Sequence, residues 1–313
     1  MGLLQGAPNP PLYFAAGLVA SLGSGAALLA LAAFVYWCVD EKKGLRLGTA
    51  LLVSAWLNIV LKFLLGQPDP ATLSATLSAA FEGLAGIEGY GHSDHGLGLP
   101  SGYAQNTLVA WLIIASWGKA RWRFVAAAVL SLLGAFSLMY LRRYFPTDIL
   151  GGWLVGGALL CFYFLAHKRI EALLTDHAPR AGLIAAAALS FAMILYRPHA
   201  QMLMSAGLLL GAGVGFYLCK RYIGFTSLAP LSRVGFARYL TLFTRFAIGI
   251  AGLFLIDALL GIALNTLRET ENFQLVVFLQ FALYSLWISV GAPWVFRAVR
   301  LSESNVIHYQ EYD

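Results

Sequence analysis

The sequence is poor in charged residues and in cysteine. Asp, Glu, Lys and Arg make up only 12% of its 313 residues and hydrophobic residues make up 59%, and the mean hydropathy is +0.73. Because a soluble core of this size cannot bury so much apolar side chain, an ordinary soluble domain is excluded. The three cysteines, Cys38, Cys161 and Cys219, lack the spacing of metal ligands. We therefore predict no disulfide, no metal site and no cofactor.

The N-terminus also lacks charge. Its first ten residues contain no Lys or Arg, so the basic region that opens a cleaved signal peptide is missing. We expect the first apolar segment to remain in the protein. The net charge of +6 is better explained by cytoplasmic loops that hold membrane helices in place than by a nucleic-acid partner.

Long apolar runs are what the sequence does contain. They are continuous rather than alternating, and many approach the ~20 residues that cross a bilayer as a helix. We therefore predict an all-α, polytopic transmembrane bundle of about nine spans. The predicted spans cover residues 12–39, 47–65, 103–118, 124–141, 149–166, 183–196, 202–218, 239–264 and 273–295.

Basic residues predict how these spans are oriented. With the N-terminus outside and the C-terminus in the cytoplasm, the cytoplasmic segments hold fifteen of the 21 Lys and Arg residues and the outer segments hold five. Cytoplasmic loops normally carry this excess of positive charge. We predict an integral protein of the inner (cytoplasmic) membrane of a bacterium, with its outer ends facing the periplasm or exterior.

Three short stretches lie at the predicted outer ends of helices. They read KFLLGQPDP over 62–70, PSGY over 100–103 and SLMYLRRYFPTD over 137–148. Their order and spacing resemble the three signatures of the type 2 phosphatidic acid phosphatase superfamily, which are Lys-x6-Arg-Pro, Pro-Ser-Gly-His and Ser-Arg-x5-His-x3-Asp. The resemblance covers roughly residues 47–166 and implies a membrane-embedded lipid phosphatase fold with a lipid phosphate as its ligand.

The residues that perform the family's chemistry are replaced in this sequence. In the family, one His attacks phosphorus, a second His protonates the leaving alcohol, and Arg residues hold the phosphate. The corresponding positions carry Asp69, Tyr103, Leu138 and Tyr144. Loss of one oxyanion donor alone costs on the order of 10²- to 10³-fold in rate, so four such losses predict little activity by that mechanism.

The candidate site is therefore predicted to be degenerate. The resemblance places Asp148, Tyr144 and Tyr103 at catalytic positions that are expected to be inactive. It places phosphate binding at Lys62, Ser101 and Gly102. Arg142 and Arg143 lie within the third stretch and could supply further positive charge. The predicted phosphate-binding set is Lys62, Ser101, Gly102, Arg142 and Arg143.

Two readings follow. In the first, the protein is a non-catalytic member that binds, presents or helps translocate a phosphatidic or polyprenyl phosphate, or regulates a membrane partner. In the alternative, it is an active lipid phosphatase or phosphotransferase whose catalytic groups have moved. That alternative requires Arg142 or Arg143 together with His92, His95 or Tyr144.

The loop before PSGY has no Lys or Arg between residues 68 and 99. Leu73, Leu77, Phe81 and Leu84 recur at helical spacing, which predicts a short amphipathic helix on the membrane surface. This helix is either a lid over the site or a simple connector. A Gly-rich stretch with His92 and His95 follows it.

The chain continues beyond the family core. We predict a core domain over 1–170 and an appended C-terminal bundle over 171–313, in which Gly207, Gly211 and Gly215 permit close helix packing. Arg245 and Asp257 lie inside one predicted span, where charge is costly. Twelve residues separate them by ~18 Å along a helix, so they cannot pair. They leave open a transporter pathway, or an interface with a membrane protein partner or a second copy.

Overall fold

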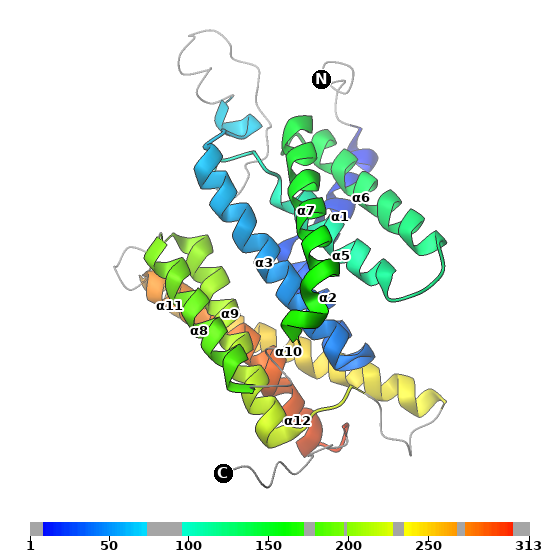
Figure 1. Cartoon of the computed structure of the whole chain (residues 1–313), viewed down its shortest axis with the longest axis vertical. Helices are drawn as coiled ribbons and strands as arrows, with labels where there is room; N and C mark the ends of the chain where they lie inside the picture. Colours follow the sequence, from blue (N-terminus) through cyan, green and yellow to red (C-terminus); the bar gives the residue numbers. More distant parts are fainter. Residues whose placement is uncertain are drawn as a thin grey trace. The chain divides into compact units, whose positions relative to one another are not determined.

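The computed structural model describes residues 9–73, 96–171, 179–196, 199–227, 235–267 and 273–302 (Figure 1). Nearly all of these residues are helical, and the described ranges contain no β-strand. An isolated antiparallel bridge joins Pro68 to Leu97. The all-α prediction is therefore confirmed.

Most of the predicted apolar segments form one helix each, and π-helical turns lie within two of them and directly after a third. In chain order the helices are α1 (Pro10–Leu22), α2 (Gly25–Phe34), η2 (Val35–Val39), α3 (Glu41–Leu65), α5 (Gly102–Ser116), α6 (Trp122–Tyr140), α7 (Pro146–Glu171), α8 (Pro179–Tyr196), α9 (Ala200–Leu218), η4 (Cys219–Ile223), α10 (Phe236–Leu267), α11 (Phe273–Leu286), η5 (Trp287–Gly291) and α12 (Ala292–Ala298). The first predicted span differs, because it bends by 52° between α1 and α2.

Six of the described helices are long and apolar enough to cross a membrane, and the bent pair adds a seventh if it forms one span. The six are Glu41–Leu65, Trp122–Tyr140, Pro146–His167, Ala200–Ile223, Phe236–Ile262 and Phe273–Ala298. Helix α5 has 15 residues, or ~22 Å of rise, which is less than the ~30 Å hydrocarbon core. The count of nine spans and the orientation stay predictions.

The helices pack into two compact units. The first unit contains Met1–Leu29 and Val53–Leu165, and the second contains Ala30–Leu52 and Ala166–Asp313. Helix α3 passes from the second unit into the first. The division into sequence domains 1–170 and 171–313 is of a different kind and stays a prediction.

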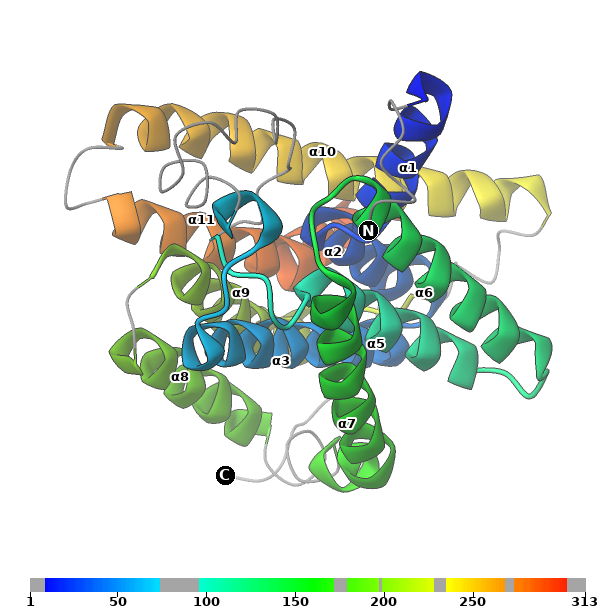
Figure 2. The ribbon, with the colours of Figure 1, turned by 90° about the horizontal axis from the view of Figure 1, so that it is seen from above.

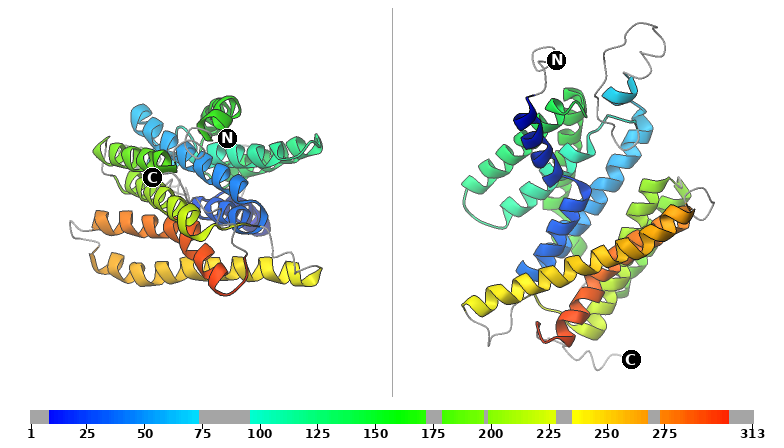
Figure 3. Two further views of the ribbon diagram at one scale, coloured as in Figure 1. Left: turned by 60° about the horizontal axis from the view of Figure 1, so that its bottom comes forward. Right: turned by 180° about the vertical axis from the view of Figure 1, so that it is seen from behind.

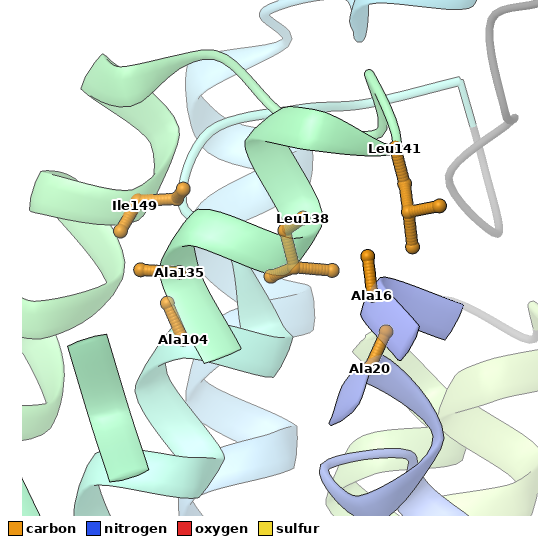
Figure 4. Close-up of a cluster of buried hydrophobic side chains, with 7 residues drawn as sticks. All are labelled: Ala16, Ala20, Ala104, Ala135, Leu138, Leu141 and Ile149. Carbon is orange, nitrogen blue, oxygen red and sulfur yellow. The ribbon is translucent and has the colours of Figure 1, made fainter. Parts of the chain in front are cut away.

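The first unit is built on the packing of α6 against α1 and α5. Its buried apolar cluster takes alanines from α1, α5 and α6 and larger residues from the C-terminal end of α6 and from α7 (Figure 4). The cluster consists of Ala16, Ala20, Ala104, Ala135, Leu138, Leu141 and Ile149. The cluster includes the C-terminal end of α6, where the third of the signature-like stretches begins.

In the second unit, α9 packs against both α8 and α11, and α10 runs beside α11 (Figures 2 and 3). Gly207 and Gly211 approach the α11 backbone so closely that an added Cβ would overlap the carbonyl oxygens of Phe278 and Ala282. An added Cβ at Gly215 would likewise overlap the Ser289 hydroxyl oxygen. The predicted close contact along this glycine face is confirmed, and it lets two apolar helices approach without larger side chains between them.

Candidate functional site

The three signature-like stretches meet at one end of the first unit. The Ser101 amide donates to the Asp148 carbonyl at 2.8 Å, which joins the second stretch to the third. The Asp69 amide donates to the Gly96 carbonyl, also at 2.8 Å, and so joins the first stretch to the segment that leads into the second. Residues far apart in sequence therefore form one continuous site at the helix ends.

Two helix starts in this site are capped by Ser101 and Asp148. Ser101 is fully buried, and its hydroxyl accepts a hydrogen bond from the Ala104 amide at 3.3 Å at the start of α5. Asp148, in the first turn of α7, is also fully buried, and its Oδ2 accepts from the Phe145 amide at 2.9 Å. Its Oδ1 has no hydrogen-bond partner among the described residues. Both side chains act as caps, and one carboxylate oxygen keeps spare acceptor capacity.

Lys62 lies inside the site rather than on its surface. Its side chain is 5% exposed, and Nζ donates to the Leu97 carbonyl at 2.5 Å. The same ammonium lies 5.4 Å from the centroid of the Tyr144 ring, within range of a cation–π attraction. Lys62 and Asp69 are both close enough to Asp148 to interact with its carboxylate electrostatically. Lys62 therefore ties the first and third stretches together around a buried carboxylate.

Leu138 and Tyr103, two of the four positions predicted to depart from the signatures, belong to an apolar core rather than to a polar pocket. Leu138 is 1% exposed and lies between Ala135 of its own helix and Ala16 and Ala20 of α1 (Figure 4). Tyr103 packs against the same cluster, and its hydroxyl donates to the Val19 carbonyl of α1 at 2.9 Å. Both side chains therefore attach α1 to the motif-bearing helices.

The other two of the four positions are also used structurally. Asp69 is fully buried, and its Oδ1 accepts from the Thr72 amide at 2.7 Å, so the carboxylate caps the helical turn that begins at Pro70. Tyr144 is half-buried against the apolar cluster and beneath the Lys62 ammonium. An acid at position 69 stabilises the turn, whereas the family's Arg would present a cation there.

Arg142 and Arg143 follow the C-terminal end of α6. The Arg142 amide donates to the Met139 carbonyl and the Arg143 amide to the Leu138 carbonyl, both at 3.0 Å, which is the hydrogen-bond pattern of a Schellman motif. Arg142 has a φ of 55°, in the left-handed region where glycine is usual. The Arg143 side chain is exposed and makes no hydrogen bond or ion pair with the described chain. It is the accessible cation of the site.

Sequence reasoning missed a buried chain of amides beneath the second stretch. The Asn58 side-chain nitrogen of α3 donates to the Pro100 carbonyl at 3.0 Å and to the Gln105 side-chain oxygen at 2.9 Å. Gln105 in turn donates to the carbonyl and hydroxyl of Ser54. An added Cβ at Gly102 would lie 2.6 Å from Asn58 Oδ1. The sequence did contain a sign of this network, because Asn58 and Gln105 lie within apolar runs. An unsatisfied polar group is costly there, so each amide needs a partner.

Several predicted features fall elsewhere. His92 and His95, and the proposed amphipathic helix beyond Leu73, lie outside the described residues. In the described ranges no group of three or more His, Cys, Asp or Glu side chains could hold a metal. Arg245 and Asp257 belong to the second unit and bind different partners, as their spacing predicted.

Arg245 is fully buried and its guanidinium binds backbone carbonyls. It donates to Leu301 at 2.7 and 3.1 Å, to Trp37 at 3.1 Å and to Ser227 at 2.6 Å. Trp37 lies in η2, and the other two carbonyls follow η4 and α12. Arg245 therefore joins three chain segments, and this arrangement favours a structural role over a transport pathway.

Residues 43–171 match the PAP2 superfamily, and residues 203–304 match the transmembrane extension of PAP2 superfamily phosphatases. An 87-residue stretch, 28% of this chain, is 28% identical to a lipid A 4'-phosphatase of Bacteroides thetaiotaomicron. The match spans 39% of that relative's length. No solved structure matches the chain. Together with the apolar helices, these matches identify an integral membrane protein.

Proposed function

We propose, from the premise that the chain belongs to the PAP2 superfamily, that it binds the phosphate headgroup of a membrane lipid without hydrolysing it. The observation that carries this proposal is the packing of Leu138 and Tyr103. These two positions, which would hold an Arg and a His in an active site, are part of the apolar contact with α1. Neither side chain can bind phosphate or transfer a proton to a leaving group from there.

The kept features suit binding rather than chemistry. Helices α5 and α7 begin at the site, and the positive ends of their dipoles favour an anion there. The exposed guanidinium of Arg143 and the left-handed Arg142 lie beside the same end of α7. An arginine pair binds a phosphate monoester through charge-assisted hydrogen bonds. We propose that these cations, with Ser101, Gly102 and Lys62 behind them, receive the headgroup from the periplasmic or exterior side.

One observation favours hydrolysis as a second candidate function. The similar protein from Bacteroides thetaiotaomicron is a phosphatase that acts on a lipid. For this chain to share that activity, Tyr144 or another group would have to replace the missing nucleophile. A protonated phenol is a weak nucleophile. Tyr144 also packs against Lys62 and the apolar cluster.

The test measures binding and phosphate release by the same preparation. Purified protein in lipid nanodiscs is assayed for release of inorganic phosphate from phosphatidic acid, and for binding of labelled phosphatidic acid against phosphatidylcholine. We expect no release and a clear preference for the phosphate monoester. Arg143→Gln should weaken that preference about fivefold, which corresponds to ~1 kcal/mol. Arg238→Gln, which removes an exposed Arg from α10, is the matched control and should change nothing.

Each result decides between the two candidates. Phosphate release that falls with Arg143→Gln but not with Arg238→Gln would establish the hydrolytic alternative and refute a purely binding role. Equal affinity for phosphatidic acid and phosphatidylcholine would refute headgroup recognition. Equal losses in both Arg variants would show general attraction to an anionic surface rather than a site.

A further inference from the structure

Asp257 is an acidic side chain on the exposed face of a membrane helix. It lies in α10 within the apolar span Phe236–Ile262, eight residues or ~12 Å from the midpoint of that span. Phe254, three residues earlier and so on the same face, is 70% exposed, and the neighbouring Ala258 is exposed as well. The carboxylate is therefore surrounded by side chains suited to lipid.

Two side chains of α11 hold one oxygen of this carboxylate. Asp257 Oδ1 accepts from the Tyr284 hydroxyl at 2.6 Å and from the Gln280 amide at 3.1 Å. The Gln280 amide also donates to the Tyr284 hydroxyl at 2.9 Å, and Gln280 itself is buried. Both donors are committed to Oδ1, and no described residue donates to Oδ2. These two donors fix the orientation of the carboxylate, and the Oδ2 of this exposed residue keeps its acceptor capacity.

A carboxylate in this position needs a partner from outside the described chain. Charged groups are costly in the hydrocarbon region, and those that occur there pair with one another or face polar surroundings. A second copy of this chain offers no suitable cation in its described part. The Lys and Arg residues of its apolar helices are buried, as Lys62 and Arg245 are, or lie within two turns of a helix end. Charge complementarity thus indicates a different helix that carries a basic residue.

We propose that the α10–α11 face around Asp257 docks a transmembrane helix of another protein, through a lysine or arginine at the depth of this carboxylate. Tyr284 and Gln280 act as positioning residues, because they hold Oδ1 and present Oδ2 to the incoming cation. The apolar side chains around Asp257 supply the van der Waals contact that such helix pairs require. This surface is independent of the phosphate site, so either proposal can fail without the other.

The test uses a synthetic transmembrane peptide as the partner. Full-length protein carrying a donor dye is placed in phosphatidylcholine vesicles with an acceptor-labelled Leu-Ala peptide of about 20 residues. One peptide contains a single Lys and its control contains Leu at that position. We expect wild-type protein to prefer the Lys peptide about tenfold, as a polar contact between membrane helices allows. Asp257→Asn should abolish the preference, and Tyr284→Phe should reduce it.

Asp40→Asn is the matched control. It removes an acid at the start of α3, where Asp40 accepts from the Lys43 amide at 2.9 Å, and Asn keeps this cap. The preference for the Lys peptide should survive that change. Equal binding of both peptides by wild-type protein, or a preference that persists in Asp257→Asn, would overturn the proposal. Formation of wild-type dimers that Asp257→Asn abolishes would also overturn it, because the occupant would then be a second copy.

Discussion

The most deeply buried ionisable side chains are acids in the first unit and a base in the second, although the first unit also buries Lys62. In the first unit the buried carboxylates of Asp69 and Asp148 accept from backbone amides at the starts of helical segments. In the second unit the buried guanidinium of Arg245 donates to carbonyls at or just past helix C-terminal ends. Each sign of charge matches the helix dipole that it meets.

This contrast changes how buried charge should be interpreted here. Perturbed, buried ionisable groups often mark active sites, although structural networks contain them as well. In this protein Asp69 caps a turn, and Arg245, inside a candidate membrane span, joins three segments. In both units, therefore, a buried ionisable side chain stabilises the fold by satisfying backbone groups at helix ends. The predictions below test that shared explanation.

Loss of the Arg245 guanidinium should have the largest effect. Arg245→Met leaves the carbonyls of Trp37, Ser227 and Leu301 buried without this donor. Each unsatisfied buried acceptor costs about 1–3 kcal/mol, so we expect a loss of about 4 kcal/mol in unfolding free energy. Thermal stability in detergent, followed by size-exclusion chromatography, measures it. Arg238→Met, on the exposed surface of the same helix, should change stability little, and an equal loss there would contradict the carbonyl explanation.

Restoring an arginine in the first unit should have the next largest effect. Leu138→Arg places a cation in the apolar cluster with Ala16 and Ala20, and we expect a loss of about 3 kcal/mol because no partner for the charge lies there. Leu138→Met, which keeps volume and polarity, should cost less than about 1.5 kcal/mol. Thermal unfolding of both variants provides the measurement. A stable Leu138→Arg protein that releases phosphate would show that this position still opens into a catalytic pocket.

Glycine substitutions at two arginines with the same backbone geometry, one in each unit, should have the smallest effect on stability. Arg142 follows α6 with φ 55° and Arg300 follows α12 with φ 57°. Glycine relieves the left-handed strain but adds freedom to the unfolded chain, so both Gly variants should stay within about 1 kcal/mol of wild type. Only Arg142→Gly should weaken phosphatidic acid binding in the nanodisc assay. Equal binding losses in both variants would remove Arg142 from the phosphate site.

Much of the candidate site followed from sequence spacing. The distances between Lys62, Ser101 and Asp148 along the chain predicted that three stretches share one end of a helical bundle, and the structure brings them into contact. The structure adds capping roles for Ser101 and Asp148, because short polar residues before or within a first helical turn satisfy free amides. The bend between α1 and α2 and the amide chain of Asn58 and Gln105 did not follow.

The sequence by itself determined an all-α membrane protein and its family. Hydrophobic run length and motif spacing are properties of the chain alone, so folding cannot alter them. Only the tertiary structure decided what the residues at the signature-like positions do. Whether Leu138 and Tyr103 face a polar pocket or an apolar helix depends on where α1 packs. That position is set by contacts between residues more than eighty apart in sequence, and helix periodicity carries no record of such contacts.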